Sequence, residues 1–205
     1  MLIVFFIMIN HTALQTGSEL LEKIHERIDG CVLCPLGQCQ PTYYVPGMGT
    51  QKAALLFVGE GPGKQEDLKG LPFVGASGKF LDHLLQLIGL RRDAIYITNV
   101  VKCRPPDNRD PTEEERKVCA PYLDEQICLI QPKIVVTLGR YSLAHFLPGT
   151  TIGTVHGQPK RRTSDGIIVF PCYHPAVALY NGSMRSVLEE DFRKLGSLLA
   201  LLSVS

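Results

Sequence analysis

Three short segments of the chain carry side chains and backbone that could bind a ligand closely. Gly59 to Gly63 holds three glycines in five residues, so backbone amides there can approach a ligand without obstruction by side chains. Asn99 presents a donor and an acceptor on one amide, and His174 can donate a hydrogen bond to a developing anion. Each feature alone is also common in plain structural roles, as a tight turn, a strand-end residue or a core histidine.

Two familiar phosphate-binding patterns do not fit the glycine segment. A nucleotide P-loop would need a serine or threonine after Lys64 and a glycine five residues before Gly63, where Gln65 and Val58 stand. The dinucleotide fingerprint fails because Lys64 occupies the place of its last glycine.

Four cysteines have a spacing that is typical of a metal site. Cys31 and Cys34 form a C-x2-C pair, and 15 residues separate Cys103 from Cys119. Four thiolates could hold zinc or a [4Fe–4S] cluster, and the spacing does not choose between them. The odd total of seven cysteines, with no secretory pattern before them, favours a reducing prokaryotic cytosol.

The segments that must position these residues alternate between strand and helix. Apolar, partly β-branched runs predict buried strands at 53–58, 95–101, 134–138 and 167–172. Amphipathic helices are predicted from Ser18 to Gly30, from Ser77 to Gly89, and from Thr112, where Glu115 has capping-box spacing and Pro121 should kink or divide the helix. This alternation predicts an α/β fold with a central parallel sheet flanked by helices, and ligands in such sheets bind beyond the carboxyl ends of the strands.

Length and composition indicate one domain of ordinary size. The 205 residues are 45% apolar and 20% charged, and we assign residues 17–205 to a single domain that acts as a monomer. The apolar stretch within residues 1–16 is shorter than the roughly 20 residues of a membrane helix, so we expect a dispensable or misassigned start or an extra strand rather than a weak membrane or partner contact. With 21 basic and 20 acidic residues, any contact with nucleic acid must come from local basic clusters.

Taken together and in order, the motifs resemble those of the family 4, iron–sulfur uracil-DNA glycosylases. They are Gly-Glu-Gly-Pro-Gly, Pro-Phe-Val-Gly, Tyr-Ile-Thr-Asn-Val-Val-Lys-Cys-Arg-Pro-Pro and His-Pro-Ala, and the resemblance runs from about Cys31 to the C-terminal helix. It implies the uracil-DNA glycosylase fold and hydrolysis of the N-glycosidic bond of flipped-out deoxyuridine, in single- or double-stranded DNA, during base-excision repair. It also implies that Cys31, Cys34, Cys103 and Cys119 bind a [4Fe–4S] cluster, which we expect to be structural.

The resemblance implies a role for each residue of the site. Phe73 would stack on the flipped uracil, and the amide of Asn99 would match the N3–H and O4 edge of uracil and mismatch cytosine. His174, with backbone amides around Gly59 and Gly61, would stabilise the departing uracil anion. Glu60 would position water or balance the positive charge on the sugar. Glu66 and Asp67 are the alternatives to Glu60, unless they are simply solvated acids at a helix start.

The chain departs from better-known uracil glycosylases at the first motif. Those enzymes have Gly-Gln-Asp-Pro-Tyr, so Gly61 stands at the aspartate and Gly63 at the tyrosine that excludes thymine. The segment from Leu179 to Arg185 resembles the loop that enters the minor groove, with Leu179 as wedge and Arg185 as phosphate contact. The basic run 160–162 is a further candidate phosphate contact.

Two rival functions remain open from the sequence. One is a superfamily relative with another base preference or with covalent attachment to DNA, although the histidine that the covalent type has near Cys103 is absent from Arg104-Pro105-Pro106. The other is a metal-bound nucleic-acid-binding module without catalysis, which the presence of Glu60, Asn99 and His174 disfavours.

Overall fold

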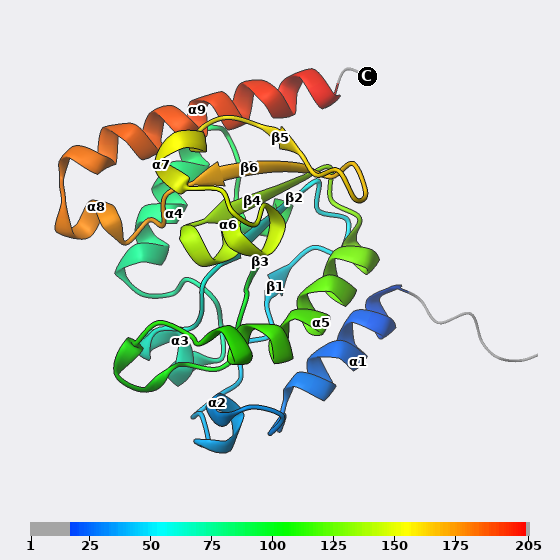
Figure 1. Cartoon of the computed structure of the whole chain (residues 1–205). Helices are drawn as coiled ribbons and strands as arrows, with labels where there is room; N and C mark the ends of the chain where they lie inside the picture. Colours follow the sequence, from blue (N-terminus) through cyan, green and yellow to red (C-terminus); the bar gives the residue numbers. More distant parts are fainter. Residues whose placement is uncertain (1–16, 204–205) are drawn as a thin grey trace, which may run out of the picture.

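A mixed β-sheet forms the centre of the molecule (Figure 1). The computed structural model describes residues 17–203. Within them, six strands pair in the order β1-β3-β2-β4-β6-β5. Their bounds are β1 (Met48–Gly49), β2 (Leu55–Gly59), β3 (Tyr96–Asn99), β4 (Ile134–Leu138), β5 (Lys160–Arg161) and β6 (Ile168–Cys172). The predicted extension at residues 1–16 lies outside the described residues and stays a prediction.

The four strands predicted from apolar runs are confirmed as β2, β3, β4 and β6, and they are parallel to one another. Phe57 on β2 pairs with Ile97 on β3 and with Val136 on β4, and every residue of these three strands is buried. The sheet is not wholly parallel, because β1 and β5 add antiparallel edges. Each edge strand has only two residues, which is too short to produce a sequence pattern.

Helices cover both faces of the sheet (Figure 1). Leu56 and Val58 point into a core shared with α1 (Gly17–Ile28) and α5 (Glu113–Ile130), whereas Leu55 and Phe57 point into a core shared with α4 (Ala76–Leu87) and α9 (Ser183–Ser203). The alternation follows from the two-residue period of a strand. Short helices connect these elements: α2 (Pro35–Gln38), α3 (Lys64–Lys69), α6 (Arg140–Phe146), α7 (Ile152–Val155), α8 (Val177–Tyr180), and the 3-10 turns η1 (Arg92–Ala94) and η2 (Pro106–Asn108).

Helix α5 confirms the predicted capping box and rules out one of the two effects expected of Pro121, a division of the helix. Thr112 Oγ1 accepts the amide of Glu115 at 3.2 Å, and Glu115 Oε2 accepts the amide of Thr112 at 2.8 Å, so the predicted capping box is present. Pro121 does not divide the helix, which runs undivided from Glu113 to Ile130. The carbonyl that loses its amide partner to Pro121 belongs to Lys117, an exposed residue, so water can satisfy it.

None of the described helices combines the length and apolar character that a membrane crossing requires.

Candidate active site

A cavity of about 650 Å³ opens at the carboxyl ends of the parallel strands. Glu60 and Gly61 follow β2 in its wall, Asn99 ends β3, Gly139 follows β4, and His174 lies two residues beyond β6. These residues are far apart in the chain and meet because parallel strands end at a common edge. All three segments thus lie beyond the carboxyl ends of the strands, where the sequence predicts ligand binding in such a sheet.

Gly59 allows two of the cavity's side chains to pack tightly against the end of β2. A methyl carbon on Gly59 would overlap Oδ1 of Asn99 and lie 2.7 Å from the ring of Phe73. Asn99 is 2% exposed and Phe73 is 4% exposed. Gly59 was predicted to bind substrate, but it is not among the residues that line the cavity. What Gly59 contributes is the space that its missing side chain leaves for Asn99 and Phe73.

His174 has a defined tautomer and is neutral. Its Nδ1 accepts the backbone N–H of Ala176 at 3.2 Å, which leaves the proton on Nε2. Burial lowers the pKa of His174 to about 4, although the nearby carboxylate of Glu66 partly opposes this effect. The imidazole stacks on Phe73 with ring centroids 5.5 Å apart. His174 thus presents a neutral N–H donor in the cavity at physiological pH.

Glu60 is a half-buried carboxyl group in the cavity wall with a strongly altered pKa. Burial raises the pKa of Glu60 to about 7, and the negative charge of Asp110 adds to the rise. Arg140, which pairs with Asp110 at 2.5 Å, partly opposes it. Glu60 therefore changes its protonation state near neutral pH.

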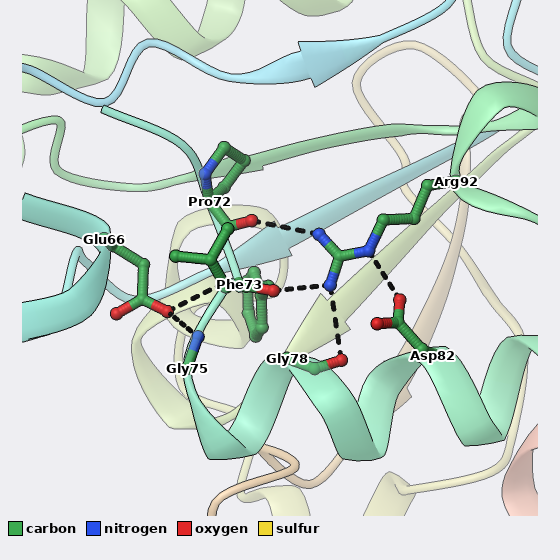
Figure 2. A network of polar contacts seen from close by, with 8 residues as sticks. Glu66, Pro72, Phe73, Gly75, Gly78, Asp82 and Arg92 are labelled. Carbon is green, nitrogen blue, oxygen red and sulfur yellow. Dashed lines mark hydrogen bonds and ion pairs between the residues drawn. The ribbon is translucent and has the colours of Figure 1, made fainter. Parts of the chain in front are cut away.

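Glu66 and Asp67, the alternative carboxylates, are buried, so they are not solvated acids at a helix start. Glu66 Oε1 accepts the amides of Val74 and Gly75 at 2.9 and 2.8 Å (Figure 2). Asp67 Oδ1 accepts the amide of Thr42 at 3.1 Å. Both carboxylates are bound to backbone, and of the two only Glu66 lines the cavity.

Comparison with known proteins agrees with this geometry. The model of the uracil DNA glycosylase superfamily matches residues 46–196. The type-4 uracil-DNA glycosylase of Sulfurisphaera tokodaii is 50% identical over 88% of this chain and 85% of its own length. The type-4 enzymes of Archaeoglobus fulgidus and Saccharolobus solfataricus are 47% and 46% identical, over 88% and 85% of this chain and 94% and 84% of their own lengths.

The chain belongs to the type-4 uracil-DNA glycosylases.

The four cysteines that the motif resemblance singled out come together in this type-4 glycosylase. Cys34, Cys103 and Cys119 are buried in the core beneath α1 and α5, and Cys31 packs against it. Burial raises the pKa of the Cys103 thiol, and the charges of the other three thiolates raise it further. The hydroxyl of Tyr122 donates to Sγ of Cys31 at 3.4 Å. Among residues 17–203, no three ligand-type side chains converge tightly enough for one metal ion. A four-iron cluster is larger and holds its thiolates farther apart.

The predicted DNA-contacting residues lie on α8, which contributes to the cavity wall, and on α9, which follows it in the chain. Leu179 is 50% exposed on α8, and the neighbouring Tyr180 is 90% exposed. Arg185 is on α9, where its guanidinium lies 4.8 Å from the centre of the Phe80 ring and pairs with Glu189 at 3.3 Å. The basic run 160–162 is not part of the cavity wall, and its Arg162 pairs with Asp165.

Sequence reasoning missed several polar residues in the cavity wall and an arginine that binds the backbone around Phe73. Asn108, Arg109, Asp110 and Arg140 line the cavity, and the first three lie in or just after η2. Arg92 donates a hydrogen bond to the carbonyl of Pro72, in the segment between α3 and α4 that contains Phe73 (Figure 2). No local pattern marks these residues, because short polar connections are common on protein surfaces.

Proposed function

We propose that this type-4 glycosylase removes uracil from single- or double-stranded DNA, leaving an abasic site for base-excision repair. The observation that carries the proposal is the neutral Nε2–H donor of His174, set beside Phe73 and Asn99 in one cavity. The names of the type-4 relatives support the same substrate. We further propose that the protein acts as a monomer.

The base would be bound after it leaves the helical stack, because its glycosidic bond is inaccessible inside a duplex. Phe73 provides an aromatic surface for stacking, and the Asn99 amide provides the donor and acceptor that match the uracil edge. Backbone around Gly61 would contact the base directly, since this residue lines the cavity without a side chain.

Cleavage leaves negative charge on the uracil O2 and positive charge on the sugar. The Nε2–H of His174 would donate to that oxygen, and this bond strengthens as the charge develops. The hydrogen bond from the Ala176 amide fixes the tautomer of the imidazole, and because its pKa is about 4 the ring does not become a cation at neutral pH. His174 would therefore act as a hydrogen-bond donor rather than as a proton donor.

Glu60 would act on the other side of the reaction. Its carboxylate can position the attacking water or balance the positive charge on the sugar, and both roles require the ionised form. Glu66 and Asp67 fit these roles less well, because their oxygens accept backbone amides.

Leu179 and Arg185 would contact the DNA. The exposed Leu179 suits a wedge that fills the vacated stack. The Arg185 guanidinium is held over Phe80 and remains about half exposed, so it can still reach a phosphate.

Cys31, Cys34, Cys103 and Cys119 would hold a [4Fe–4S] cluster. Such a cluster can carry an electron, whereas N-glycosidic hydrolysis transfers none, so we assign it a structural role. It would join the segment after α1 to the start of α5. No disulfide joins any of the seven cysteines, which suits a reducing prokaryotic cytosol.

The basic test is incubation of purified protein with a uracil-containing oligonucleotide, followed by alkali. We expect a nick at the uracil, because alkali breaks the strand at an abasic site. An intact strand at high enzyme excess would favour the non-catalytic binding module, and a nick at a different base would favour a relative with another base preference.

Replacement of His174 by alanine should slow single-turnover cleavage by about a hundredfold or more, the scale for a lost anion-stabilising donor. Binding of uracil DNA should change much less, because the donor meets full charge only as the bond breaks. His145→Ala, which removes a histidine outside the cavity, is the matched control. Near-normal cleavage by His174→Ala, or a defect that disappears at saturating enzyme, would refute this role.

The cleavage rate should rise with pH around neutrality. Glu60 has its pKa raised to about 7, so it is protonated below that pH and becomes the active carboxylate above it. His174 stays neutral throughout a range of about pH 5.5 to 8.5 and adds no slope. The single-turnover rate of Glu60→Gln should therefore not rise with pH in this range. Asp110→Asn should move the midpoint to lower pH, because it removes a negative charge that raises the pKa. An unchanged slope in Glu60→Gln would exclude Glu60 as the titrating group.

Protein purified without oxygen should be brown, with a broad absorbance at about 400 nm. Cys103→Ser should lose the colour and the iron, whereas Cys128→Ser, which changes an exposed cysteine outside the set, should retain both. A colourless wild-type protein that contains one zinc ion would overturn the cluster assignment and leave the glycosylase proposal standing.

A further inference from the structure

The ring of Phe73 depends on an unfavourable backbone conformation. Phe73 has a φ of +53°, in the left-handed region that residues with a side chain seldom adopt. The segment between α3 and α4 would relax from this conformation unless its surroundings held it. Because the direction of the ring follows from the backbone, whatever holds the backbone also aims the ring at His174.

Two charged side chains hold the peptide groups around Phe73 from opposite sides (Figure 2). The carboxylate of Glu66 accepts the amides of Val74 and Gly75. The guanidinium of Arg92 donates to carbonyl oxygens of the same segment and of the helix that follows: Nη1 donates to Pro72 at 3.1 Å, and Nη2 donates to Phe73 and, at 3.3 Å, to Gly78.

Arg92 is committed to this segment rather than to solvent. Its Nε donates to Oδ1 of Asp82 at 2.5 Å, so all three guanidinium nitrogens have partners. Its side chain is 22% exposed, whereas that of the adjacent Arg91 is 83% exposed. A lysine could not reproduce these bonds, because its ammonium group lacks the planar arrangement of donors.

We propose that Arg92 is a positioning residue for base recognition, which fixes the left-handed backbone of Phe73 and thereby orients the stacking ring. Glu66 completes the support from the other side, and Asp82 orients Arg92. The proposal rests on the proposed function, because Phe73 has a base to stack on only if the protein binds uracil. Arg92 itself does not line the cavity.

The test compares Arg92→Met with Arg91→Met, which removes a neighbouring arginine of the same charge. The probe is a duplex with one 2′-fluoro-deoxyuridine, whose fluorine slows cleavage so that binding can be measured. Arg92→Met should weaken binding by about tenfold, whereas Arg91→Met should stay within about twofold. Arg92→Lys should resemble Arg92→Met, and Asp82→Asn, which keeps the guanidinium, should show a smaller loss in the same direction.

A double-mutant cycle with Phe73→Leu separates positioning from general destabilisation. If Arg92 acts through the ring, the double variant should bind no more weakly than Phe73→Leu alone. Binding by Arg92→Met equal to that of Arg91→Met, or losses that add in full in the double variant, would overturn the proposal.

Amide hydrogen exchange tests, without any DNA, whether Arg92 holds the backbone around Phe73. The amides of Val74 and Gly75 should exchange faster in Arg92→Met than in Arg91→Met, while the buried amides of β2 remain protected. If the wild-type protein failed to bind or cut uracil DNA, the proposed function would be wrong. The exchange rates would still show whether Arg92 holds the backbone around Phe73. Unchanged exchange at both amides would overturn it.

Discussion

The site depends on one constraint of the sheet, which is that β2, β3, β4 and β6 run parallel and therefore end at the same edge. Residues that lie dozens of positions apart in the chain become neighbours at this edge. The end of β2 must also leave room for the side chains that line the cavity. Gly59 provides this room, because a side chain at this position would occupy the space of Asn99 and the Phe73 ring.

Behind that edge, the buried Lys102 joins the end of β3, which carries Asn99, to α5. Lys102 lies next to Cys103, and its Nζ donates to Oγ1 of Thr98 at 2.6 Å, to the carbonyl of Asn99 at 2.8 Å and to Oε1 of Gln126 at 2.9 Å. Burial lowers its pKa to about 8, so these bonds are what make a cation tolerable in the core. The backbone that presents Asn99 is thus fixed from the side of the cysteines.

Burial shifts the pKa values of two residues in the cavity wall, His174 and Glu60, in opposite directions. Burial disfavours the charged form of each, so it lowers the pKa of His174 and raises that of Glu60. A neutral imidazole suits a fixed hydrogen-bond donor, whereas a carboxyl group that titrates near neutrality places a negative charge in the cavity wall only above its pKa. Arg140 and Asp110, which sequence reasoning missed, set part of the second value.

The sequence alone determined the elements whose signals are local. Apolar β-branched runs predicted the four parallel strands, and the spacing from Thr112 to Glu115 predicted the capping box, because both depend on residues within a few positions of one another. The order of short motifs pointed to the family, which the comparisons confirmed. Only the tertiary structure decided the pKa values of His174 and Glu60 and the commitment of Glu66 to backbone amides. It also revealed Arg92 and placed the two-residue edge strands. These properties arise from burial and from partners on other loops or strands, and such contacts leave no periodic trace in the sequence.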